Sequence, residues 1–284
     1  LACGIFRPHL PWYAPQKYFD MYPLKDIVLP DVQDGDLSDV PQEGRQLAAS
    51  RRADFLRIKE RGKWKEAVQA YLACISFADA QLGRVLDALQ AGPSRGNTII
   101  VFWSDHGWHL GEKNHWHKST LWEEATRIPF IMAVPGITRG GARCKRPVDT
   151  LCIYPTLLEL CNIESGDGLD GVSIVPLLKD PGMRWDIPAI SEFRRGQCAV
   201  RSERYRYIRY SDGTSELYDH SRDPGEWDNL SGKKHKEVIK VLARSIPARF
   251  APDAPSKNAY DFDPHSYTWI DRKTGKITHG KKKK

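Results

Sequence analysis

The chain has 284 residues, of which 40% are hydrophobic and 10% aromatic, so it can bury a substantial core and is not disordered throughout. Its glycines and prolines do not recur at a regular spacing, which excludes collagen-like and solenoid repeat proteins. The net charge is +7, but residues 231–284 hold 14 Lys and Arg against 5 Asp and Glu, which leaves the rest slightly acidic. We therefore expect a solvated basic tail ending in Lys281–Lys284 and no specific nucleic-acid partner.

The first part of the chain alternates between predicted helices and strands. Residues 1–6 are apolar and strand-like, whereas 7–44 are rich in proline, aromatic and acidic residues, which indicates loops. Apolar residues at helical spacing predict a helix over 64–89. The β-branched run 98–103 is apolar on both faces, which is typical of a central parallel strand covered by helices.

The alternation continues with a short helix near 121–125, a strand at 128–134 and a helix at 153–160, which predicts an α/β domain with a partial, doubly wound, mostly parallel sheet. The longest apolar runs have about six or seven residues, too few for a transmembrane segment. Beyond residue 184 alternating apolar residues indicate antiparallel strands. We expect two domains: 1–183, part of the α/β domain, and 184–284, a smaller antiparallel α+β subdomain with the basic tail.

The six cysteines are too few and scattered for a disulfide framework, and without a CxxC pair a zinc ribbon is not expected. The cysteines do not decide whether the protein resides in an oxidising or a reducing compartment. Residues 1–6 lack the charged region and the cleavage site of a signal peptide, and we expect them to continue a unit that begins upstream.

Residues that carry chemistry gather directly after the strand at 98–103. In an open α/β sheet, ligands bind outside the carboxyl ends of the strands. At that position Asp105 offers carboxylate oxygens and His106 an imidazole nitrogen to a cation, and Gly107 lets the chain turn away. Alone, Asp105 could cap a turn and His106 could be a loop histidine, but the clustering favours a functional site.

Three more histidines follow within this segment: His109, His115 and His117. Their spacing does not give the i, i+4 pair of a helical zinc site. We expect them to be mostly loop or surface histidines.

An ordered set of motifs over residues 1–250 resembles the C-terminal half of the type I sulfatases. The motifs are Ser104-Asp105-His106-Gly107-Trp108, Leu110-Gly111-Glu112, Trp116-His117-Lys118, Ile128-Pro129-Phe130, Val134-Pro135-Gly136, Tyr154-Pro155-Thr156-Leu157, Leu169-Asp170-Gly171 and Glu216-Leu217-Tyr218-Asp219. Each motif is weak, and the ordered set is specific. Most type I sulfatases have Asn after this Asp. The His at that position in this chain resembles the iduronate-2-sulfatase-like members.

The resemblance implies an alkaline-phosphatase-like fold and a sulfuric ester hydrolase that acts on a sulfate monoester, as in a sulfated small molecule or polysaccharide. It implies that Asp105 and His106 are half of the ligands of one Ca²⁺. It also implies that Lys118 contacts the sulfate, that His9 holds the sulfate and protonates the leaving alcohol, and that Trp108 lines the substrate pocket. A cation and an ammonium suit the dispersed negative charge, and an imidazole suits the acid.

The chain departs from the family at the nucleophile. That residue is a formylglycine made from Cys or Ser in Cys/Ser-x-Pro-x-Arg, and none of the six cysteines has proline two residues later. Ser245-Ile246-Pro247-Ala248-Arg249 fits the pattern, but it follows the Asp-His motif instead of preceding it, so we reject it. The family's Asp-Asp pair is also lacking. We therefore expect a truncated sulfatase, inactive by itself.

Other functions stay open. One is a zinc phosphodiesterase or phosphomutase of the same superfold, which zinc in place of calcium would indicate. Another is a non-catalytic remnant that binds sulfate or carbohydrate, and a third is an interaction module built on the basic tail. The resemblance implies a periplasmic, secreted or lysosomal location without deciding among them, and the oligomeric state is open.

Overall fold

The computed structural model describes residues 1–280 except 165, 167, 233 and 253–258. The predicted tail, Lys281–Lys284, lies outside the described residues. Contacts along the chain define two compact units, Leu1–Pro247 and Ala248–Lys284. The domain boundary predicted at residue 183 stays a prediction.

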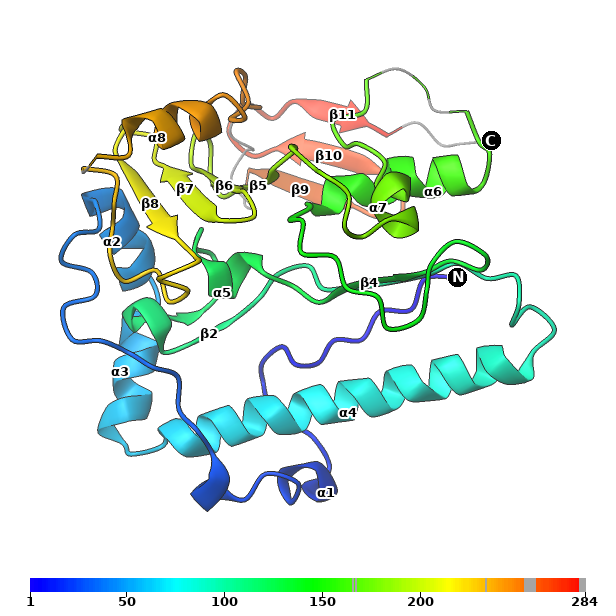
Figure 1. Cartoon of the computed structure of the whole chain (residues 1–284), viewed down its shortest axis with the longest axis horizontal. Helices are drawn as coiled ribbons and strands as arrows, with labels where there is room; N and C mark the ends of the chain where they lie inside the picture. The colour runs from blue at the N-terminus through cyan, green and yellow to red at the C-terminus, as the bar shows by residue number, and fades with distance from the viewer. Residues whose placement is uncertain (165, 167, 233, 253–258, 281–284) are drawn as a thin grey trace. The chain divides into compact units, whose positions relative to one another are not determined.

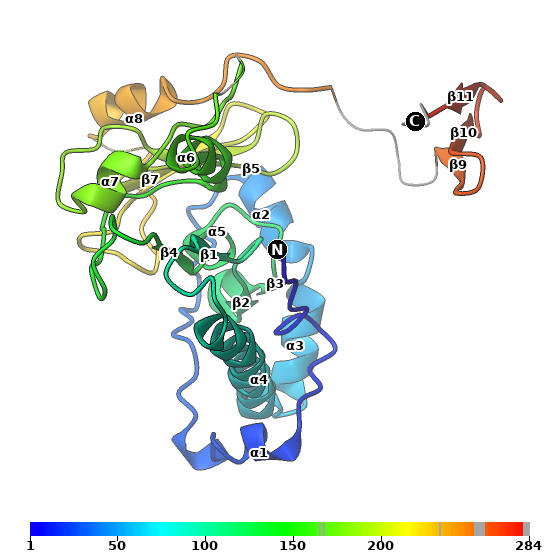
Figure 2. The same cartoon turned by 90° about the vertical axis from the view of Figure 1, so that its right-hand side faces the viewer.

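Helices cover both sides of a two-stranded ladder in the first unit. The ladder joins β1 (Ile100–Trp103) to β4 (Phe130–Ala133). The long helix α4 (Trp64–Ala91) lies on one side, and α6 (Ile153–Leu160) and α7 (Val175–Lys179) lie on the other (Figures 1 and 2). A buried cluster of Cys152, Ile174 and Leu177 packs against Phe130 and Met132 of β4. This burial of apolar surface holds the layers together.

The direction of strand pairing corrects one prediction. β1 and β4 are antiparallel, with Ile100 opposite Ala133 and Trp103 opposite Phe130, and every strand pair that the structure describes is antiparallel. A parallel pair needs a long crossover, usually a helix. The intervening segment 104–129 contains only a short hairpin and α5 (Glu123–Thr126). An apolar run indicates that a strand is buried but does not indicate its direction. The prediction of a mostly parallel sheet was wrong for this reason.

The N-terminal segment contains helices that the sequence reading did not predict. Residues 1–6, expected to be strand-like, pair with no strand in the described structure. The helices are α1 (Gln16–Phe19), η1 (Leu24–Asp26), α2 (Gln42–Ala49) and α3 (Arg52–Glu60).

A four-stranded antiparallel sheet follows, as predicted for this region. Its strands, in spatial order, are β5 (Ala189–Glu192), β6 (Cys198–Arg201), β7 (Tyr205–Arg209) and β8 (Ser215–Asp219). Helix α2 packs closely on it, since a Cβ at Gly44 would lie 2.5 Å from the Tyr210 hydroxyl. The buried core between them includes Leu47, Trp122 and Tyr218. Helix α8 (Lys236–Ala243) contacts β7.

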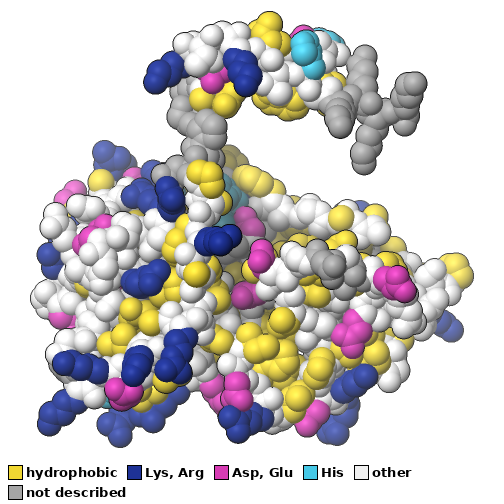
Figure 3. Space-filling model, turned by 90° about the horizontal axis from the view of Figure 1, so that it is seen from above, with side chains coloured by type: hydrophobic (Ala, Val, Ile, Leu, Met, Phe, Trp, Pro, Cys, Tyr) yellow, Lys and Arg dark blue, Asp and Glu magenta, His cyan; other side chains and the backbone are white. Residues whose placement is uncertain are grey.

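The second unit is a three-stranded antiparallel sheet in the order β11-β10-β9. Its strands are β9 (Tyr260–Asp263), β10 (Thr268–Asp271) and β11 (Ile277–His279). The region lies within the predicted antiparallel subdomain, but its weak periodicity predicted no individual strand. In the described part of the chain, no helix is both long and apolar enough to span a membrane. Lys and Arg side chains are interspersed with hydrophobic and acidic ones on the face of the first unit seen in Figure 3.

Candidate active site

The segment after β1 folds back as a short hairpin. β2 (His109–Leu110) pairs with β3 (Trp116–His117), and the turn η2 (Glu112–Asn114) joins them. Gly107 holds this segment against α5, because its N–H donates to the Ala125 carbonyl at 2.8 Å. A Cβ at Gly107 would lie 1.9 Å from the Glu124 carbonyl oxygen, so the close approach requires glycine.

The indole of Trp108 is the centre of a cluster that contains three of the other predicted site residues. The rings of His9 and His106 lie 5.8 and 6.1 Å from the Trp108 ring, and the Lys118 Nζ lies 5.9 Å from it. The ring of His117 is nearer still, at 5.0 Å. We call these residues, with Trp12 and Tyr71 at 6.1 Å each, the Trp108 cluster.

The Trp108 cluster is assembled from segments far apart in sequence. His9 comes from the N-terminal loop, Tyr71 from α4, His106 from the loop after β1, and Lys118 from the end of β3. Trp108 is only 8% exposed, and its Nε1–H has no hydrogen-bond partner among the described residues. Predicted residues for sulfate binding, catalysis and metal binding therefore meet around one buried indole.

Asp105 and His106 can each offer one donor atom to a divalent cation. The His106 Nδ1–H donates to the Gly107 carbonyl at 2.7 Å, which leaves Nε2 with a lone pair. That Nε2 lies 3.5 Å from the Asp105 Oδ2, so both atoms can reach the same ion. The Asp105 side chain is 85% exposed and open to further ligands.

His9 is held in the same tautomer as His106. Its Nδ1–H donates to the Leu10 carbonyl at 2.8 Å, so Nε2 is the basic nitrogen. The Arg7 guanidinium fixes the surrounding loop by donating to the carbonyls of Tyr13 and His9. An imidazole with one nitrogen held by the backbone presents the other in a defined direction.

A second group of potential metal ligands is an ion-pair network instead. In the described part of the chain, Glu123, His220 and Glu226 are the one set of three or more such residues close enough to share an ion. Arg206 pairs with both glutamates, and the Arg201 Nε lies 3.2 Å from the Glu123 Oε2. Burial alone would raise the pKa of Glu123, but the two arginines lower it to about 2. These guanidiniums already supply the positive charge that an ion would bring.

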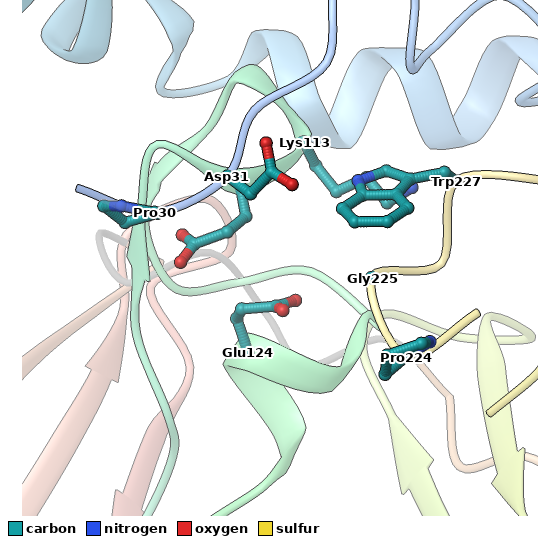
Figure 4. A pocket seen from close by; sticks show the side chains of 8 residues that line it. Pro30, Asp31, Lys113, Glu124, Pro224, Gly225 and Trp227 are labelled. Carbon is teal, nitrogen blue, oxygen red and sulfur yellow. The ribbon is translucent and has the colours of Figure 1, made fainter. Parts of the chain in front are cut away.

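A cavity of about 280 Å³ lies near this network and not at the Trp108 cluster. Figure 4 shows Asp31, Glu124, Lys113 and Trp227 around it, and no predicted site residue lines it. Burial, reinforced by neighbouring carboxylates, raises the pKa of Glu124 well above its usual range. The Lys113 ammonium is bound elsewhere, to the Asp36 carboxylate at 2.7 Å.

Two histidines that we expected at the surface are fully buried, which corrects that prediction. The His109 Nε2 lies 2.7 Å from the Thr120 hydroxyl. The two ring nitrogens of His115 lie 2.9 Å each from the carbonyls of Ala48 and Lys118, and a neutral ring donates to one of them. Burial lowers the pKa of both histidines, which favours their neutral forms.

His117 and Asp54 are members of the site region that the sequence reading missed. The His117 Nε2 lies 3.3 Å from the Asp54 Oδ2, and burial lowers the pKa of His117 although Asp54 opposes the shift. The two residues are 63 positions apart, so only the packing of α3 on β3 brings them together. In the sequence, only the position of His117 next to Lys118 indicated that it could belong to the site.

Two family models match the chain: Sulfatase over residues 5–163, and N-sulphoglucosamine sulphohydrolase, C-terminal, over residues 111–249. The first match spans more than half of the chain. The chain belongs to the sulfatase family. This confirms the resemblance derived from the ordered motifs.

Curated sulfatases match nearly the whole chain. A protein described as "Sulfatase" from Formosa agariphila is 43% identical, over 96% of this chain and 54% of its own length. Iduronate 2-sulfatase of Homo sapiens is 36% identical, over 87% of this chain and 50% of its own length, which confirms the likeness to that subgroup. The chain thus spans about half the length of these relatives.

Solved structures confirm the alkaline-phosphatase-like α/β fold class. A phosphonate monoester hydrolase from Silicibacter pomeroyi has a TM-score of 0.72 and 25% identity, and the match covers 84% of this chain and 53% of that one. A structure described as being in complex with its substrate D-glucosamine-2-N,6-O-disulfate has a TM-score of 0.66 and 21% identity, and covers 84% of this chain and 62% of that one.

Proposed function

We propose that this chain contributes the C-terminal part of a sulfatase active site that hydrolyses a sulfate monoester of a carbohydrate. The observation that carries the proposal is the Trp108 cluster, because it gathers His9, His106 and Lys118 around one indole. Family membership supports the reaction class. The substrate bound in one structural neighbour, a disulfated glucosamine, supports a sulfated sugar as the substrate class.

In this proposal the chain's own residues bind and orient the ester. The Lys118 ammonium attracts a sulfate oxygen and stabilises the charge that grows as the S–O bond to the alcohol opens. In its protonated form His9 donates from Nε2 to the sulfate and delivers that proton to the leaving alcohol, because Nδ1–H stays bound to the Leu10 carbonyl. Trp108 forms an apolar wall that keeps water away from these charges.

Asp105 and His106 are the proposed ligands of a divalent cation, for which we propose Ca²⁺. When bound, this ion supplies positive charge that polarises the sulfate group. The carboxylate oxygen and the free imidazole nitrogen described above are compatible donors. We further propose that the formylglycine nucleophile lies outside these 284 residues, so that the chain by itself does not turn over.

A second candidate is hydrolysis of a phosphonate or phosphate ester. The likeness to a phosphonate monoester hydrolase favours it, because that protein has the same fold with a TM-score of 0.72. Both substrates present a tetrahedral anion to the same kind of site. The rates at which the two kinds of ester are hydrolysed therefore decide between the candidates.

The experiment uses a complemented enzyme, meaning this chain joined to the part of the Formosa agariphila relative that lies outside the match. Its release of sulfate from sulfated hexoses is compared with its release of phosphate from hexose phosphates and of phosphonate from a phosphonate monoester, each with Ca²⁺ or Zn²⁺. We expect kcat/KM for sulfate esters with Ca²⁺ to exceed the others at least tenfold. Faster phosphorus ester hydrolysis with Zn²⁺ would favour the second candidate, and an equally active chain alone would contradict the proposed division.

A further inference from the structure

His117 lies in the Trp108 cluster and is bound to a carboxylate from a different element. Its ring contacts Trp108 at 5.0 Å, and its Nε2 lies 3.3 Å from the Oδ2 of Asp54 on α3. The side chain of His117 is 21% exposed and that of Asp54 is 36% exposed. The pair is therefore partly shielded yet still reachable from solvent.

The carboxylate of Asp54 decides which nitrogen of His117 carries the proton. An ionised carboxylate can only accept, so Nε2 bears the hydrogen and Nδ1 keeps a lone pair. Throughout the part of the chain that the structure describes, no hydrogen bond to this Nδ1 is found. A neutral acceptor is thus left available beside the indole.

The backbone departs from a regular strand on both sides of Lys118. Successive side chains of a regular strand point to opposite faces. Here His117 has a φ of 80° and Ser119 a φ of 77°, values that cost about 1 kcal/mol for residues other than glycine. Lys118 lies between them, and both its ammonium and the His117 ring reach Trp108.

The two neighbouring groups suit different parts of one ligand. The ammonium of Lys118 attracts an anion, whereas a neutral nitrogen lone pair repels anionic oxygen and attracts a hydroxyl hydrogen. A ligand that satisfies both groups carries a sulfate ester and, close to it, a free hydroxyl. Sulfated saccharides have this combination, and simple aryl sulfates lack it.

We propose that His117 accepts a hydrogen bond from a sugar hydroxyl next to the sulfate ester and so determines which esters bind. Asp54 acts as a positioning residue, because it holds the proton on Nε2. The inference rests on the proposed function only in taking the ligand to be a sulfate ester. Its substrate class is a sulfated saccharide with a free neighbouring hydroxyl.

Binding to the 284-residue chain tests this inference by calorimetry. The probes are methyl hexoside monosulfates, sulfated at each position in turn, with the neighbouring hydroxyl either free or O-methylated. We expect the chain to bind the free form of its preferred isomer about 10-fold more tightly than the methylated form. H117F should reduce this preference to less than about twofold and leave the Kd of the methylated form unchanged.

Matched variants separate recognition from structure. H117N retains an acceptor oxygen where Nδ1 lies and should keep most of the preference, whereas D54A should lose part of it because the tautomer is no longer held. H265F, at an exposed histidine in the second unit, should behave like the unaltered chain. Equal weakening of both probe forms by H117F would indicate a structural role and overturn the inference.

The outcomes distinguish the inference from the proposed function. A preference that survives H117F, or the lack of any preference in the unaltered chain, overturns the inference whatever the enzyme does. Sulfate release by the complemented enzyme is measured separately. If the preference depends on His117 but no sulfate is released, the proposed function fails and the recognition role stands.

Discussion

The buried ion pair between Lys113 and Asp36 anchors the turn η2 of the hairpin that carries Trp108 and Lys118. The Lys113 Nζ lies 2.7 Å from the Asp36 Oδ1, and the two side chains are 1% and 2% exposed. The ammonium also donates to the Glu226 carbonyl. D36A removes the charged partner and leaves the ammonium buried.

The expected cost of D36A follows from this burial. Breaking a buried pair from one side costs about 3–5 kcal/mol. The Glu226 carbonyl and the Tyr218 ring, 5.1 Å from Nζ, still face the ammonium, so we expect a value near the lower end, about 3 kcal/mol. Replacing both partners should cost less, because burial outweighs the attraction of Lys113 and raises the pKa of Asp36.

Urea unfolding followed by tryptophan fluorescence measures these differences. The double variant D36L/K113M should lie within about 1.5 kcal/mol of the unaltered chain, and D26A, at an exposed aspartate, within about 0.5 kcal/mol. A cost of less than about 1 kcal/mol for D36A would contradict the stabilising role of this ion pair, and so would a double variant that loses as much as the two single variants together.

Three further predictions concern the site and its support. G107A should lower the unfolding midpoint and weaken calcium binding, because the added Cβ collides with the Glu124 carbonyl; unchanged values for both would contradict the close approach. The ion pairs of Glu123, whose pKa is lowered from 4.5 to about 2, should contribute about 3 kcal/mol of stability above pH 4.5 that is lost as the pH falls towards 2. Acid titration of unfolding should therefore show a shallower decline for E123Q, and parallel curves would exclude the pairing. D105N should raise the calcium Kd of the complemented enzyme at least tenfold by calorimetry, whereas an unaltered Kd would remove Asp105 from the ligand set.

The sequence was informative wherever local pattern and burial coincide. The helical spacing over 64–89 and the alternation over 198–210 both correspond to observed elements, α4 and β6–β7. Strand direction could not be read in the same way, because β1 and β4 owe their pairing to the path of the segment between them. The amphipathic helices α2 and α3 follow a loop-like region and were not predicted.

The candidate site also contains residues that a local sequence pattern indicates and residues that only tertiary packing brings together. Asp105 and His106 were predicted because their donors are adjacent in sequence, and Lys118 and His9 were predicted because they lie in motifs that resemble the family. The contact between His117 and Asp54 spans 63 positions and depends on tertiary packing. Similarly, the spacing of His109 and His115 shows that they lack a helical zinc arrangement but not that their rings lie in the core.

Sulfate release by K118A in the complemented enzyme tests the central claim most directly, since the claim is that Lys118 stabilises the sulfate beside Trp108. K17A, on helix α1, is the matched control. We expect K118A to lower kcat/KM for the sulfated saccharide at least 100-fold, with an unaltered unfolding midpoint, and K17A to change it less than twofold. Equal rates for K118A and the unaltered enzyme would contradict the account.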